Sequence, residues 1–115
     1  MYGTDDGTLS ISKANYDGFD GNVGHATDIG SYPANPFGLY DMSGNVGEWC
    51  ADWSSPEYYD TSDNADDPTG PTWGNNRVVR GGSWVQPDES CRSADRGNNG
   101  PNFNSVTIGF RVVSR

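Results

Sequence analysis

Hydrophobic residues occur in short groups along this chain and follow no helical repeat over any window of about 12 residues. The clearest alternation covers Val46–Trp53. In an extended strand, this segment places Trp49 and Trp53 on one face and Glu48 and Cys50 on the other. The pattern predicts a β-strand whose aromatic face is buried in the core.

Three more strand-like groups follow in the C-terminal part, and they read RVVRGGSW, CRSADR and IGFRVVSR. Gly81 and Gly82 close the first group, at a position where backbones approach closely or a bulge forms. The last group places Phe110 in the core, with Arg111 facing outward or forming an ion pair. Because the three groups are close together in the sequence, they predict an antiparallel meander.

The remaining segments are rich in turn-forming residues. The chain has 16 glycines and 7 prolines, which disfavour long helices. Ser54–Asn76 is a long acidic insertion without periodicity, and loops of this length commonly carry function or cover other parts of a domain. We therefore expect one loop-rich α+β domain over residues 1–115, with a small antiparallel sheet and little helix.

Composition and charge narrow the functional classes. Only 32% of the residues are hydrophobic, yet 12% are aromatic, which favours a small aromatic-rich core over disorder. The net charge of −9 argues against a nucleic-acid partner, because phosphate binding requires clustered Lys and Arg. No apolar run is long enough to cross a membrane. The excess of Asp and Glu solubilises the surface and also suits calcium, which prefers hard oxygen ligands.

Cys50 and Cys91 are the two cysteines of the chain. They either form one disulfide across the core or remain two buried thiols. Together with His25, the single histidine, they are too few for a four-ligand zinc site. His25 lies in a polar loop, where we expect it to be solvated.

Four motifs follow one another in a specific order: NPFGLYDMSGNVGEW, RVVRGGSW, CRSADR and IGFRVV. In this combination the chain resembles the formylglycine-generating-enzyme/sulfatase-modifying-factor family. The resemblance implies a variant of the C-type lectin fold, which serves oxidases, sulfoxide synthases and ligand-binding variable proteins of diversity-generating retroelements. It covers only the C-terminal half of the family domain, which implies a truncated or minimal form. Apolar surface left uncovered in this way favours a homodimer or a companion chain that supplies the missing half.

The resemblance does not extend to the copper site of the family's oxidases. Those enzymes hold copper through a Cys-x4-Cys pair that follows the GGS motif, and Cu(I) needs both soft thiolates. Here Gln86 stands near the first cysteine position, and alignment of the later motifs leaves Cys91 outside the second. Ser83 matches a family active-site serine but cannot replace a metal pair. The histidine-based iron site of the sulfoxide synthases also has no counterpart, so we expect no enzymatic activity.

The resemblance implies a calcium site in the segment DMSGNVGEW. The matching ligands are two side chains and two backbone carbonyls: Asp41 and Glu48, and Gly44 and Val46. Such hard oxygens are what Ca²⁺ binds. The alternative is that Asp41 caps the Ser-Gly-Asn turn while Glu48 pairs with an arginine such as Arg80 or Arg111. A second family site corresponds to ANYDGFDG: Asn15, Tyr16, Asp17 and Asp20.

Without catalysis, a binding module is the leading class, because this fold presents loops at one end of its sheet. The segments SWVQPDES and DRGNNGPNFNSVT combine short amide side chains with an aromatic anchor, as antibody-like loops do. The residues expected to bind a protein or glycan ligand are Trp84, Gln86, Asp88, Asn98, Asn99, Asn102, Phe103 and Asn104. The tripeptide QPD also matches a sugar-recognition motif of C-type lectins, whereas the asparagines and glycines alternatively just build turns.

Two functional hypotheses follow. The first is a noncatalytic C-type-lectin-like binding module that is stabilised by calcium. The second is a fragment or degenerate relative of a formylglycine-generating-type oxidase.

Overall fold

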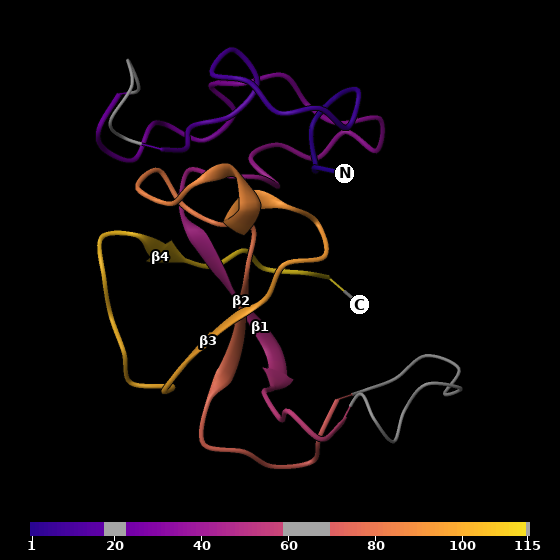
Figure 1. The fold of residues 1–115 in the computed structure, drawn as a ribbon, viewed down its shortest axis with the longest axis vertical. Helices are drawn as coiled ribbons and strands as arrows, with labels where there is room; N and C mark the ends of the chain where they lie inside the picture. The colour runs from indigo at the N-terminus through magenta and orange to yellow at the C-terminus, as the bar shows by residue number, and fades with distance from the viewer. Residues whose placement is uncertain (18–22, 59–69, 115) are drawn as a thin grey trace.

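The computed structural model describes residues 1–17, 23–58 and 70–114 (Figure 1). Within these residues the regular elements are four strands and one 3-10 helix: β1 (Gly47–Trp53), β2 (Arg77–Arg80), η1 (Asp88–Cys91), β3 (Gly97–Asn99) and β4 (Ile108–Gly109). Long loops make up the rest of the described chain. In this described part, no helix has the length and apolarity needed to cross a membrane.

The four strands form one mixed sheet in the order β3-β2-β1-β4. β1 pairs antiparallel with β2, with Trp49 opposite Val79, and β2 pairs antiparallel with β3. β4 departs from the expected antiparallel arrangement, because it lies parallel to β1, with Gly47 opposite Ile108. The chain leaves β3 at one edge of the sheet and returns at the other edge, and such a crossover produces a parallel neighbour. The meander expected from the last three strand-like groups does not form, because β2 pairs with β1 and β3, and β4 pairs with β1.

The structure differs from the expected secondary structure at two segments after β2. The group CRSADR is not a strand: Cys91 ends η1, and Arg92 forms only an isolated bridge with Tyr2. Pro87 precedes η1 with φ −68°, which starts a tight turn and lacks a backbone N–H for a sheet ladder. The next strand, β3, instead comes from the sequence Gly-Asn-Asn, which was expected to be a loop.

The core is smaller and more polar than the sequence predicts. Its buried apolar side chains are Ala14, Val78, Val79 and Cys91. Trp49 and Trp53 are only half-buried, and the Trp53 ring packs against the guanidinium of Arg77 at 3.6 Å. Phe110 is 76% exposed, so its placement in the core was wrong. β4 ends at Gly109, which leaves the following residue beyond the sheet that would cover it.

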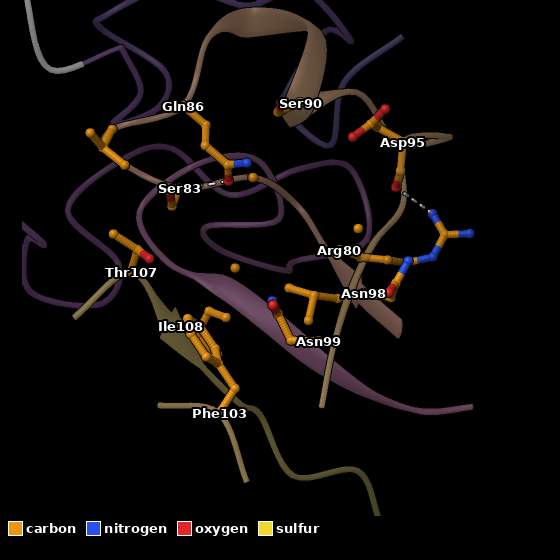
Figure 2. A pocket seen from close by; sticks show the side chains of 15 residues that line it. Arg80, Ser83, Gln86, Ser90, Asp95, Asn98, Asn99, Phe103, Thr107 and Ile108 are labelled. Carbon is orange, nitrogen blue, oxygen red and sulfur yellow. Dashed lines mark hydrogen bonds between the residues drawn. The ribbon is translucent and has the colours of Figure 1, made fainter. Parts of the chain in front are cut away.

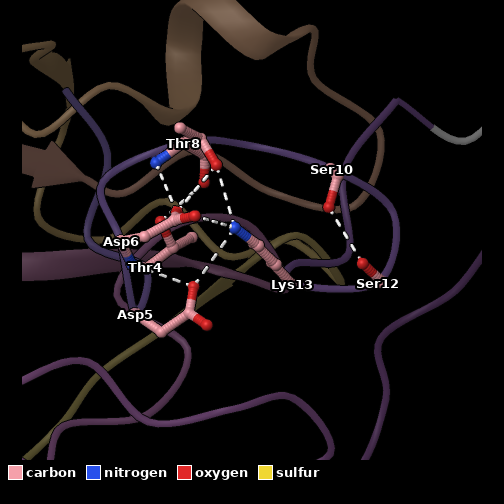
Figure 3. Close-up of polar contacts among 7 residues, drawn as sticks. All are labelled: Thr4, Asp5, Asp6, Thr8, Ser10, Ser12 and Lys13. Carbon is pink, nitrogen blue, oxygen red and sulfur yellow. Dashed lines mark hydrogen bonds and ion pairs between the residues drawn. The ribbon is translucent and has the colours of Figure 1, made fainter.

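Polar contacts hold the N-terminal loop together (Figure 3). Lys13 forms ion pairs with Asp5 at 3.4 Å and with Asp6, and it donates a hydrogen bond to the Thr8 hydroxyl at 2.9 Å. The hydroxyl of Thr4 donates to the carbonyl of Thr8 at 2.6 Å. The Lys13 ammonium and the Thr8 hydrogen bonds hold the pKa of Asp6 well below its usual range. This network is at the surface, so it orders the loop more than it stabilises the domain.

Candidate functional site

A cavity of about 410 Å³ lies over the sheet and draws lining residues from all four strands (Figure 2). Gly47 of β1, Val79 of β2, Asn99 of β3 and Ile108 of β4 contribute to its wall. Two loops complete the wall: the segment that contains Ser83, Val85, Gln86 and Ser90, and the segment that contains Phe103 and Thr107. The cavity therefore depends on an assembled sheet.

Half of the expected ligand-binding residues meet in this cavity. Gln86, Asn98, Asn99 and Phe103 line it. Figure 2 shows Gln86 with Ser83 on one side and Asn98 near Arg80 and Asp95 on another. Side chains that the sequence interpretation did not assign to ligand binding also contribute, and these are Arg80, Ser83, Ser90, Asp95 and Thr107. The sequence pattern does not identify these residues as lining residues, because only the fold brings β2 and the loop before β4 together.

The other four expected ligand residues lie outside the cavity lining. Trp84 is half-buried, and its indole N–H lies 3.5 Å from the carbonyl of Val106. Asp88 accepts a hydrogen bond from the backbone N–H of Glu89 at 3.0 Å. Asn102 and Asn104 are exposed on the loop that flanks Phe103. Gln86 and Asp88 of the QPD tripeptide therefore do not face one common site.

The glycine pair after β2 positions this site. Gly82 has φ +70°, and a Cβ atom there would lie 2.6 Å from the Cys91 sulfur and 2.8 Å from the Ser90 carbonyl oxygen. No other residue fits without displacing η1. The predicted close approach at this glycine is confirmed. It fixes η1 against the end of β2 and leaves the neighbouring Ser83 only 1% exposed.

The cavity wall presents mainly neutral hydrogen-bonding groups. Ser83 donates its hydroxyl to Gln86 Oε1 at 3.2 Å, and Asn98 Oδ1 accepts from Asn76 at 2.7 Å. The charged members are turned to partners of their own. Arg80 donates to the Ser93 carbonyl at 2.6 Å, and Asp95 pairs with Arg92 at 3.5 Å.

Cys50 and Cys91 are free thiols in this structure, in place of the disulfide that was one of the two expectations. Cys91 is fully buried against Gly82, whereas Cys50 is half-buried on β1, so the two sulfurs have different surroundings. Burial raises the pKa of Cys91 to about 11 and also raises the pKa of Cys50. Four residues separate Gln86 from Cys91, which is the spacing of a Cys-x4-Cys pair with glutamine at its first position.

Three of the four expected calcium ligands line a second cavity, of about 510 Å³: Asp41, Val46 and Glu48. In this cavity Arg111 pairs with both carboxylate oxygens of Glu48, one of them at 2.7 Å, and donates to the Tyr40 carbonyl at 3.0 Å. Asp41 accepts from the backbone N–H of Gly30 at 2.8 Å, rather than capping the Ser-Gly-Asn turn.

This arrangement leaves limited room for an ion at Glu48. A carboxylate offers about four lone-pair sites, and Arg111 uses two of them. The described residues contain no group of three or more His, Cys, Asp or Glu side chains that converge on one point. Any calcium at this place would depend on the Asp41 carboxylate and on backbone carbonyls, so the donor set fits only in part.

The second family segment fits an ion better. Asn15 is fully buried, and its Oδ1 has no hydrogen-bond partner among residues 1–17, 23–58 and 70–114. Its amide nitrogen donates to the His25 carbonyl at 2.8 Å, which fixes the orientation of the side chain. A buried carbonyl oxygen without a partner is costly, so it marks a place for a cation or a water. Asp17 is adjacent with φ +44°, and Asp20 lies outside the described residues.

A set of large apolar side chains is exposed, as the predicted association requires. The set comprises Ile29, Phe37, Phe110, Val112 and Val113. Phe110 and Ile29 line the same cavity as Glu48. A homodimer or a companion chain stays a prediction, and light scattering coupled to size-exclusion chromatography tests it.

The chain is similar to known proteins over nearly its whole length. A family model described as the sulfatase-modifying factor enzyme 1-like domain matches residues 4–115. The serine/threonine-protein kinase pkn1 of Chlamydia caviae is 45% identical over 106 residues, which is 91% of this chain and 16% of the kinase. The formylglycine-generating enzyme of Streptomyces coelicolor is 45% identical over 98 residues, which is 83% of this chain and 31% of the enzyme.

Solved structures agree with this similarity. PvdO from Pseudomonas aeruginosa matches with a TM-score of 0.76 and 31% identity, over 93% of this chain and 41% of that one. Treponema denticola variable protein 1 matches with a TM-score of 0.72 and 34% identity, over 86% and 34%. The expected C-type-lectin-like fold is confirmed. The chain spans less than half the length of each of these relatives.

Proposed function

Because the chain belongs to the sulfatase-modifying factor enzyme 1-like family, we propose that it is a noncatalytic binding module whose ligand enters the cavity over the sheet. One observation carries the proposal: Gln86, Asn98, Asn99 and Phe103 converge on that cavity. Amide groups around an aromatic side chain supply orientation and contact area without any reactive group.

The thiol chemistry of the same region supports a noncatalytic role. Cu(I) binding by the family's oxidases uses two thiolates, and here Gln86 takes the place of one of them. The remaining thiol, Cys91, is fully buried with its pKa raised to about 11. Such a group is almost entirely protonated near neutral pH and is a poor nucleophile or metal ligand.

The alternative is a fragment or degenerate relative of a formylglycine-generating oxidase. Its support is the 45% identity to the Streptomyces coelicolor enzyme and the retained Cys91. One assay distinguishes the two functions. The chain is loaded with copper and incubated with a sulfatase-type cysteine peptide. Aldehyde formation detected by hydrazide labelling would establish the oxidase and rule out the noncatalytic module.

Binding itself is tested with glycan and peptide arrays, followed by calorimetry on each hit. Asn99→Ala and Phe103→Ala should each weaken a cavity ligand, whereas Trp73→Ala should not. Trp73 is 77% exposed and lines a different cavity, so it is a matched control for loss of an aromatic surface. Equal effects of the three variants on every hit would contradict binding in the cavity over the sheet.

We further propose that calcium stabilises the module at two places, one at Asn15 and one at Asp41, where Glu48 contributes the lone pairs that Arg111 leaves free. Calcium at about 100 times its Kd should stabilise the fold by about 2.7 kcal/mol, which raises Tm by several degrees. Asn15→Ala removes the proposed ligand oxygen, so it should reduce that shift. Equal melting temperatures in calcium and in EGTA, for both proteins, would remove calcium from the proposal.

A further inference from the structure

The chemistry of the cavity over the sheet identifies a class of ligand. We infer that this cavity binds a neutral saccharide through direct hydrogen bonds, without calcium as an intermediary. The inference rests on the proposed binding function and goes beyond it by selecting one ligand class. It follows from the charge of the lining, from its free hydrogen-bonding groups and from its size.

The charged side chains of the lining already have partners within the described part of the chain. The Arg80 guanidinium donates to the carbonyls of Ser93 and Asp95, at 2.6 and 3.4 Å. The Asp95 carboxylate faces Arg92 at 3.5 Å. A charged group on the ligand would therefore lose hydration and compete with the contacts that Arg80 and Asp95 already make, whereas a neutral group avoids this cost. The net charge of −9 further disfavours anionic ligands.

The free polar groups are amides and hydroxyls. The Asn99 side chain makes no hydrogen bond to the described part of the chain, and Ser90 has a free hydroxyl there. Among the described residues, Gln86 and Asn98 each use only their carbonyl oxygen, which leaves both NH₂ groups as donors. An amide that offers a donor beside an acceptor matches two adjacent hydroxyls of a sugar ring, because each hydroxyl both donates and accepts.

Phe103 adds the apolar part of the site. It is 50% exposed and lines the cavity beside these amides (Figure 2). A sugar ring has an apolar face of C–H groups that can pack on such a side chain, while its hydroxyls reach the amides. The cavity volume of about 410 Å³ is near the lower end of the roughly 300–1,000 Å³ range of small-ligand pockets. A protein partner would instead need a broad contact surface of about 800 Å² on each side.

Saturation-transfer-difference NMR on the 115-residue chain tests the inference with galactose, glucose, mannose, N-acetylglucosamine, lactose and maltose. At least one of these sugars should bind, with a Kd on the order of 1 mM. Asn99→Ala and Phe103→Ala should each weaken it roughly 3- to 10-fold, as loss of one hydrogen bond or one apolar contact predicts. Trp73→Ala should leave the affinity unchanged, and circular dichroism confirms that each variant is folded.

Two controls separate this inference from its competitors. The affinity should be the same in calcium and in EGTA at a temperature where the protein is folded in both, and loss of binding in EGTA would overturn direct recognition. Glucuronic acid should bind more weakly than glucose, and the reverse order would refute the neutral-ligand argument.

The outcomes also distinguish the inference from the proposed function. If no sugar binds but an array peptide does, and Asn99→Ala weakens that peptide, the saccharide inference fails and the binding function stands. If neither class binds in the cavity, both fail.

Discussion

The ion pair between Glu48 and Arg111 offers the sharpest test of how this domain is held together. The two residues come from β1 and from the segment after β4, and their side chains are 19% and 36% exposed. Replacing Arg111 by glutamine removes the pair with Glu48 and the hydrogen bond to the Tyr40 carbonyl. It leaves the Glu48 carboxylate mostly buried and without its partner.

The expected magnitude lies between two limits. Hydrogen bonds to charged groups contribute about 1.5–3 kcal/mol each in mutational series, whereas exposed ion pairs contribute about 0–1 kcal/mol in total. Arg111 donates four hydrogen bonds in a half-exposed setting, two to Glu48 and one each to the carbonyls of Tyr40 and Asp41, the last at the 3.5 Å limit. Solvent screening reduces each of the three shorter bonds to about 1 kcal/mol. Arg111→Gln should therefore lower the free energy of unfolding by about 2–3 kcal/mol, which corresponds to roughly 8–12 °C in Tm.

Urea unfolding followed by tryptophan fluorescence measures this loss as a lower midpoint with an unchanged slope. Arg92→Gln is the matched control, because Arg92 pairs with Asp95 at 3.5 Å with both side chains more exposed than Glu48. Its cost should stay below about 1 kcal/mol. If Arg111→Gln costs no more than the control, the ion pair does not join the end of the sheet to β1, and the reasoning is refuted.

Two further predictions concern backbone approach and thiol reactivity. Gly44→Ala should cost about 3 kcal/mol or more, because φ is +78° and the new Cβ would lie 2.3 Å from the Asn15 carbonyl oxygen. Gly38→Ala, with φ +75° and nothing within 4 Å, should cost only about 1 kcal/mol, and equal urea midpoints for the two variants would contradict this. Cys91, with a pKa of about 11, should react with DTNB only as the protein unfolds, while half-buried Cys50 reacts first. Mass spectrometry that finds both modified at one rate would refute the burial of Cys91.

The sequence predicted the strands that carry strong local signals. The alternation around Trp49 located β1 to within one residue, and Val78 and Val79 located β2. It missed β3, because Gly-Asn-Asn has low strand propensity and becomes a strand only by pairing with β2. The expected burial of Phe110 failed for a related reason: an apolar residue in an apolar segment carries no information about where its strand ends.

The candidate site also could be predicted only where local sequence composition determines it. Loop composition selected Gln86 and Asn99, and both line one cavity. It could not separate them from Asn102 or Asp88, since that depends on which way each loop residue faces after folding. The contacts of the charged side chains in the cavity wall, such as the hydrogen bond from Arg80 to the Ser93 carbonyl, join segments that no periodicity connects.

A cavity whose wall draws on every strand of a mixed sheet also has a consequence for biosynthesis. Gly47 and Ile108 become neighbours only when β4 has joined β1, so a nascent chain has no complete site until Ile108 has left the ribosome. A ligand that spans this wall binds the finished sheet and not its precursors, so it adds RT ln(1 + [L]/Kd) to the stability of the folded state. Such a compound would act as a chemical chaperone for a domain with few buried apolar side chains.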